Sequence, residues 1–66
     1  MQVTINGSPR EVPDSVTVRE LVVHLGLADG PVAVEINREI ITRAEHATRR
    51  VSGGDIVEVV HLVGGG

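Results

Sequence analysis

The chain has 66 residues, a net charge of −3, and neither cysteine nor aromatic residues. A chain of this length forms one small domain, and the missing cysteines exclude disulfides, a thiolate nucleophile and cysteine-ligated metal sites. The negative charge and the lack of aromatic stacking surfaces argue against a nucleic-acid-binding protein.

A β-hairpin is predicted at the beginning of the chain. Val3 and Ile5 alternate with polar residues, as in a half-buried strand. Asn6-Gly7 follows as a strong signal for a two-residue hairpin turn, because both residues tolerate a positive φ. The return strand is expected from about Ser8 to Val12. Pro9 predicts that this strand lies at the edge of the sheet, since proline cannot donate a ladder hydrogen bond.

The helix is the best-specified element of the sequence. Thr17 and Glu20 have the spacing of a capping box, in which each side chain satisfies the backbone N–H of the other residue. Gly26 stands where a left-handed residue commonly ends a helix. The apolar residues between these signals share one helical face, namely Val18, Leu21, Val22 and Leu25. These features predict a helix from about Val18 to Leu25.

Two further strands follow a connector. Residues 32–36 alternate between larger aliphatic and other side chains, which predicts a third strand. Asn37-Arg38 is interpreted as a tight turn into a short fourth strand, Glu39 to Thr42. Residues 43–50 have no clean periodicity and are expected to form a 3₁₀ turn or short helix with a loop. Residues 52–55, Ser-Gly-Gly-Asp, indicate a turn before the last strand.

The last predicted strand, within residues 55–63, runs directly into three glycines. Glycine adds no side-chain bulk and permits nearly any φ/ψ, so such a tail can enter a narrow channel in extended form. Four residues from Val63 onward reach at most roughly 13 Å. We therefore expect residues 1–63 to form the domain and residues 64–66 to form a flexible tail, whose terminal carboxylate is the group presented to other proteins.

The order strand, strand, helix, strand, strand, strand predicts an α+β fold. A mixed sheet of four to five strands, with the main helix across one face, buries the apolar side of every element. This is the β-grasp, or ubiquitin-like, arrangement, with the first and last strands parallel at the centre. If Val57 and Val59 face the core, the two-residue period places Val60 and Leu62 on the opposite face. Together with Val63, these two residues are predicted to contact partner proteins.

The whole chain resembles the ubiquitin-like sulfur carrier proteins of thiamine biosynthesis, the ThiS family. The resemblance rests on the Asn6-Gly7 hairpin, the capped helix, the segment A-V-E-I-N-R-E-I-I at residues 33–41, Gly54-Asp55 and the terminal glycines. The chain departs from many relatives by having no aromatic residue near the end of the last strand, where Val59, Val60, His61 and Leu62 stand.

The resemblance implies a carrier and co-substrate, not an enzyme, with no catalytic residue of its own. In this family the terminal carboxylate, here that of Gly66, is adenylated by an E1-like adenylating enzyme of the ThiF type. Sulfur from a persulfide donor then converts it to a thiocarboxylate, which a thiazole synthase of the ThiG type uses. Gly64 and Gly65 would insert into the partners' channels. No cofactor is expected to be bound, because ATP is used by the adenylating enzyme.

Three other functions are compatible with the same sequence. The small subunit of molybdopterin synthase uses the same tail chemistry with another acceptor. A β-grasp interaction module of the TGS kind would have an inert tail. A ubiquitin-like modifier would be conjugated to an amine of another protein. The final sulfur acceptor separates the first function from a thiamine carrier, and deletion of Gly65-Gly66 separates the second.

Metal binding and membrane association are not expected. His24, His46 and His61 lack the spacing of metal ligands and are interpreted as solvated or partly packed side chains. Met1 leads directly into the first strand without the regions of a signal peptide, and no apolar stretch is long enough to cross a bilayer. We expect a cytoplasmic protein without membrane or nucleic-acid partners.

Overall fold

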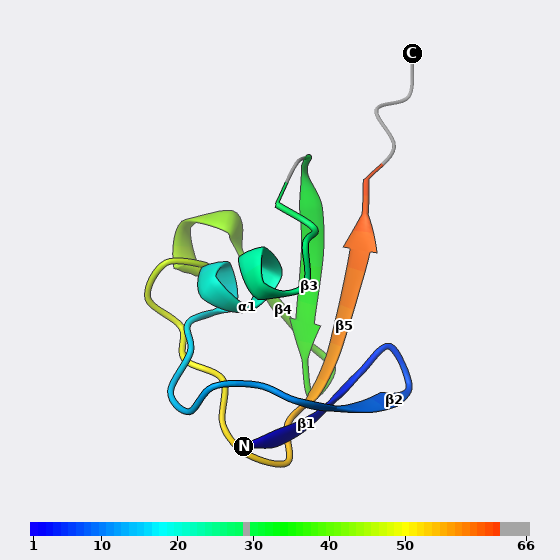
Figure 1. The fold of residues 1–66 in the computed structure, drawn as a ribbon. Coiled ribbons are helices and arrows are strands. Elements are labelled where there is room, and N and C mark those ends of the chain that lie inside the picture. Colours follow the sequence, from blue (N-terminus) through cyan, green and yellow to red (C-terminus); the bar gives the residue numbers. More distant parts are fainter. Residues whose placement is uncertain (29, 63–66) are drawn as a thin grey trace.

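The computed structural model, which describes residues 1–28 and 30–62, has one mixed sheet and one α-helix on its face (Figure 1). The strands lie in the order β2-β1-β5-β3-β4. In chain order the elements are β1 (Gln2–Ile5), β2 (Ser8–Glu11), α1 (Val18–His24), β3 (Val32–Ile36), β4 (Glu39–Ile41), the 3₁₀ helix η1 (Arg43–Glu45) and β5 (Ile56–His61). This is the β-grasp topology that the sequence predicts.

Strand β5 occupies the centre of the sheet. It pairs in parallel with β1, with Ile5 opposite Val57, and antiparallel with β3, with Val34 opposite Val59. The two hairpins, β1–β2 and β3–β4, flank it on either side. Asn6 and Gly7 both have positive φ, as do Asn37 and Arg38, so both hairpins turn through left-handed residues, as expected of two-residue turns.

Both ends of α1 are capped as the sequence predicts. Glu20 N–H donates to the Thr17 hydroxyl at 3.1 Å, and Thr17 N–H donates to the Glu20 carboxylate at 2.8 Å. Hydrogen bonds from the Thr17 backbone and side chain hold the pKa of Glu20 below its usual value. At the other end, Gly26 has φ +75°, and the N–H groups of Gly26 and Leu27 donate to the carbonyls of the last turn. This pair of bonds is a Schellman motif.

The loop after η1 also caps the beginning of α1. The N–H groups of Val18 and Arg19 donate to the carbonyls of Arg49 and His46, at 2.9 and 2.8 Å. The first N–H groups of a helix have no partner within the helix, so these two bonds satisfy two of those groups. They also fasten the loop to the helix.

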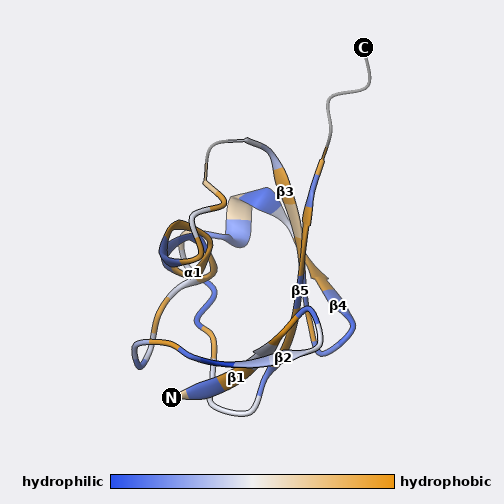
Figure 2. Cartoon of the chain, turned by 45° about the vertical axis from the view of Figure 1, so that its right-hand side comes forward, coloured by the Kyte–Doolittle hydropathy of each residue, from blue (hydrophilic) through white to orange (hydrophobic). Residues whose placement is uncertain are grey.

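The core lies between α1 and one face of the sheet (Figure 2). It is aliphatic throughout, and its most deeply buried side chains come from β1, α1, β3 and β5: Val3, Val18, Leu21, Val34, Ile36 and Val57. Leu25, the last residue of the predicted apolar helix face, packs against this cluster at its border. The other face of the sheet is not covered by any described element (Figure 2).

Several predicted boundaries move by one residue. The second strand ends at Glu11, and Val12 instead donates its N–H to the Met1 carbonyl at 2.9 Å while its side chain enters the core. The helix ends at His24, with Leu25 as its C-cap residue. The fourth strand ends at Ile41, because Thr42 is the N-cap residue of η1 and its hydroxyl donates to Glu45.

Candidate functional site

The candidate site is built on the last part of β5, which Asn6 holds in place. Val59 N–H donates to the Asn6 side-chain oxygen at 2.8 Å, and the Asn6 side-chain nitrogen donates to the Val59 carbonyl at 3.1 Å. The Asn6 backbone N–H donates to the Val57 carbonyl at 2.9 Å. The Asn6 side chain therefore replaces backbone pairing where β1 turns away, and it extends the hydrogen bonding along β5 from Val57 to Val59.

On the opposite edge, β5 is held by the segment that leads into β3. Leu62 N–H donates to the Pro31 carbonyl at 2.9 Å, one residue beyond the ends of both strands. The direction of the chain is thus determined up to Leu62. The predicted tail residues Gly64, Gly65 and Gly66, and the predicted contact residue Val63, lie outside the described residues.

Strand β5 alternates as predicted between the core and the uncovered face of the sheet. Val57 and Val59 are 0% and 5% exposed, whereas Val60 and Leu62 are 55% and 49% exposed. This confirms the predicted orientation of Val60 and Leu62. Two isoleucines are exposed as well, Ile56 on β5 at 55% and Ile40 on β4 at 72%. We call Ile40, Ile56, Val60 and Leu62 the open-face patch.

Two glutamates lie among these apolar residues. Glu35 and Glu58 are direct partners in the pairing of β3 with β5, and Glu35 is also the direct partner of Ile40. Both glutamates are exposed, and neither belongs to an ion pair within residues 1–28 and 30–62. Like charges directly opposite each other destabilise a sheet slightly. The open-face patch is therefore an apolar surface with two glutamates among its residues, and Arg38 lines the same hollow as both of them.

Ile40 and Ile56 were missed as candidate contact residues, although a signal for each was present. The two-residue period that places Val60 outward also places Ile56 outward. The same rule places Ile40 outward, because its neighbour Ile41 is buried in the core, with 3% of its surface exposed. The pairing of Glu35 with Glu58 had no local signal, because it depends on the register between β3 and β5.

The other polar residues singled out in the sequence either make local hydrogen bonds or are exposed. Asp55 accepts from Ser52 N–H at 2.8 Å and from the Asn37 side chain at 3.1 Å, as expected of a turn aspartate. His24 and His61 are exposed, and a ring nitrogen of His46 lies 3.2 Å from the Ile41 carbonyl. Within the described part of the chain no group of three or more potential ligand side chains is arranged to hold a metal ion. No helix there is both long and apolar enough to cross a membrane.

Comparison with known proteins identifies the family. The model of the ThiS family matches residues 3–66, almost the whole chain. The chain belongs to the ThiS family. The sulfur carrier protein ThiS of Thermus thermophilus is 38% identical over 64 residues, which are 97% of this chain and 98% of that protein. The crystal structure of the thiamine biosynthesis protein ThiS from Geobacter metallireducens superposes with a TM-score of 0.85, with 38% identity and full coverage of both chains.

The chain is also similar to part of much longer proteins. The thiazole synthase of Paramagnetospirillum magneticum is 41% identical over all 66 residues, yet this chain spans only 20% of its length. That protein thus contains a segment similar to the whole of this chain.

Proposed function

We propose that this ThiS-family protein is a sulfur carrier of thiamine biosynthesis, and that it acts as a co-substrate and not as an enzyme. The observation that carries the proposal is the match of the family over residues 3–66, which includes the terminal glycines, together with a ThiS protein of nearly equal length. The geometry agrees, because the chain is anchored on one edge of β5 at Val59 and on the other at Leu62, two residues before the glycine segment.

The chemistry would take place at the carboxylate of Gly66. An α-carboxyl has a pKa of about 3.3–3.7, so it is ionised at neutral pH and can attack the α-phosphate of ATP. The attack forms an acyl-adenylate and releases pyrophosphate. The terminal sulfur of a persulfide then displaces AMP, and a thiol cleaves the resulting acyl disulfide to leave the thiocarboxylate. The adenylating enzyme, of the ThiF type, would supply the ATP site, so no cofactor need be bound by this chain.

Thiazole synthase is the proposed sulfur acceptor. The support is the relative in which a segment similar to this chain is part of a thiazole synthase. Joining two proteins in one chain raises the effective concentration of each for the other, which is useful only if they act together. Gly64 and Gly65 are proposed to enter the channels of both enzymes, since a side chain there would widen the segment.

The open-face patch is the proposed docking surface, and Val63, which follows Leu62 in the sequence, is proposed as a further contact residue. An apolar surface with two glutamates, Arg38 being the one described arginine that lines the same hollow, fits a partner surface that is apolar and carries arginine or lysine opposite the glutamates. Val60 and Leu62 are the members nearest the tail in sequence. A partner that binds there can take the glycines into its active site without a change in the fold of the carrier.

The test begins with the mass of the intact protein. After incubation with ATP, a sulfide source and a ThiF-type enzyme, we expect a gain equal to replacing one oxygen by sulfur. The gain should disappear when Gly66 is deleted. A wild-type protein that forms neither adenylate nor thiocarboxylate with an enzyme active on another ThiS protein would refute the carrier function.

Docking is tested separately with charge substitutions. Leu62→Asp and Val60→Asp should raise the carrier concentration needed for half-maximal adenylation, because each places a charge in an apolar contact. His24→Asp is the matched control, since it adds a charge at an exposed position at the end of α1. Equal effects of all three substitutions would contradict docking through the open-face patch.

A further inference from the structure

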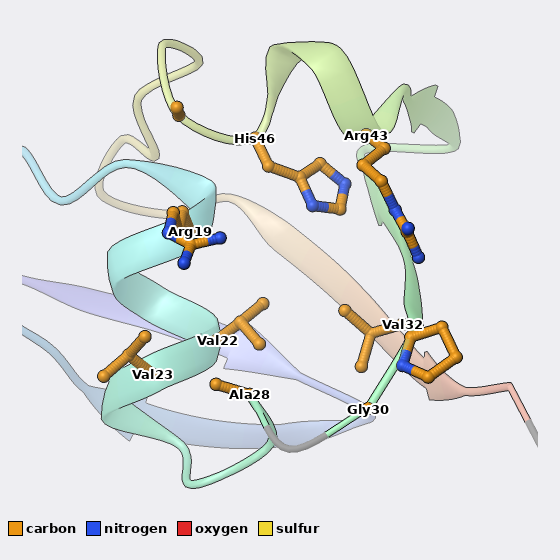
Figure 3. A pocket seen from close by; sticks show the side chains of 10 residues that line it. Arg19, Val22, Val23, Ala28, Gly30, Val32, Arg43 and His46 are labelled. Carbon is orange, nitrogen blue, oxygen red and sulfur yellow. The ribbon is translucent and has the colours of Figure 1, made fainter.

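A groove of about 630 Å³ opens on the helix side of the molecule, away from the open-face patch (Figure 3). It lies between α1, the η1 region and the segment leading into β3. Its apolar lining includes Val22 and Val23 from the helix and Val32 from the first position of β3. Val23 is 55% exposed, so the groove leaves aliphatic surface in contact with water.

Among the described lining residues of this groove, the charged side chains are those of two arginines, Arg19 and Arg43. Arg19 stands on the helix wall, and Arg43 and His46 stand on the opposite wall (Figure 3). No aspartate or glutamate is among its described lining residues. Neither arginine takes part in an ion pair or a side-chain hydrogen bond within residues 1–28 and 30–62, unlike Arg49, which pairs with Glu39 at 2.8 Å. This local positive charge contrasts with the net charge of −3 of the chain.

Backbone and side-chain hydrogen bonds connect the groove walls to the fold. Arg19 N–H donates to the His46 carbonyl at 2.8 Å, which joins α1 to the opposite wall. The His46 ring is held 3.2 Å from the Ile41 carbonyl. Pro31, on the β3 side, accepts from Leu62 N–H at 2.9 Å. An occupant of the groove would therefore bind to a preformed surface and lie beside the segment that fastens the end of β5.

We propose that this groove binds a segment of a partner protein that is apolar and carries aspartate or glutamate at its edges. Aliphatic side chains of the segment would cover Val23 and Val32, and its carboxylates would pair with Arg19 and Arg43. A protein segment is the better match than a small anion, because both arginines are exposed on an open surface and do not enclose a ligand.

The groove and the open-face patch then select partners by opposite charge. Glu35 and Glu58 lie among the residues of the patch with a single described arginine, Arg38, beside them, whereas the groove carries Arg19 and Arg43. Surfaces of complementary charge speed up encounter with the right partner and disfavour the wrong one. Because the two surfaces lie on opposite sides of the sheet, one molecule can present both at the same time. This inference does not depend on the chemistry of the tail.

The experiment is a selection of peptides from a random displayed library on the intact wild-type protein. The same selection on the Arg19→Glu/Arg43→Glu double variant serves to remove peptides that bind elsewhere. Synthetic peptides chosen in this way should be apolar and acidic, and the double variant should bind them about tenfold more weakly or worse. The matched control is Arg10→Glu/Arg38→Glu, which makes the same change of charge at two exposed arginines outside the groove and should retain the affinity.

The binding site of a selected peptide is located by amide chemical shifts of the isotope-labelled protein. We expect addition of the peptide to change the amide chemical shifts of Val22, Val32 and Ala47, and not that of Val60. Circular dichroism checks the fold of each variant, and Arg19→Gln/Arg43→Gln replaces the charge reversal if that variant is unfolded. The proposal is overturned if no peptide depends on the two arginines, if the selected peptides are basic, or if the shifts map to the open-face patch.

Discussion

Asn6 holds the end of β5, and its replacement offers a quantitative test of that role. The change Asn6→Gly removes both side-chain hydrogen bonds to Val59 and retains a residue that accepts the φ of 50° found there. Each bond contributes about 1 kcal/mol net, so the free energy of unfolding should fall by about 2 kcal/mol. In a domain of this size that corresponds to a decrease in Tm of about 8–16 °C.

Asn37→Gly is the matched control. Asn37 has the same φ of 50°, and its side chain likewise makes two hydrogen bonds, one with Ile56 N–H at 2.9 Å and one with Asp55 at 3.1 Å. These bonds are exposed, whereas those of Asn6 are partly buried. Water replaces exposed bonds easily, so we expect Asn37→Gly to cost about 1 kcal/mol or less. The change in backbone freedom is common to both variants and cancels in the comparison.

The assay is urea unfolding followed by circular dichroism, since the chain has no aromatic residue for fluorescence. Amide hydrogen exchange adds a local measurement, because Val59 N–H loses its acceptor in Asn6→Gly and should exchange faster relative to the core amides. Equal destabilisation by the two substitutions, with unchanged relative protection of Val59, would refute the proposed role of the Asn6 side chain.

Three further predictions concern the helix. Leu21→Ala should lower the free energy of unfolding by about 2–5 kcal/mol, because Leu21 is fully buried. Val23→Ala, at an exposed position, should change it by less than about 0.5 kcal/mol, and urea unfolding of both variants checks this difference. Gly26→Ala should lower the free energy of unfolding by about 1 kcal/mol in the same assay, because a φ of +75° is strained for alanine. An added Cβ would meet no atom within 4 Å, so a steric clash is not the reason. An unchanged urea midpoint would contradict the explanation by backbone strain. The lowered pKa of Glu20 stabilises the fold at pH values above the pKa of the unfolded state, near 4.5, and this stability is lost as the pH falls through the folded pKa. The Tm of Glu20→Gln should therefore depend less on pH below about 5 than the Tm of the wild type. Parallel plots of Tm against pH for the two proteins would contradict this role of Glu20.

Local patterns in the sequence were sufficient to predict most of the fold. The capping box of Thr17 and Glu20 and the Schellman motif at Gly26 determine both ends of α1, because their hydrogen bonds join residues a few positions apart. The Asn-Gly turn and the two-residue period of β5 act over similarly short distances. These signals were enough to predict the β-grasp topology and the outward orientation of Val60 and Leu62.

The tertiary structure alone decided how distant segments combine into surfaces. Asn6 and Val59 are 53 positions apart, and no local pattern indicates that the Asn6 side chain forms hydrogen bonds with the backbone of β5. Glu35 meets Glu58 only because of the register between β3 and β5. The basic groove likewise needs α1, η1 and the beginning of β3 in place. Periodicity determines which face of its own element a residue occupies, whereas register and packing between elements determine its neighbours.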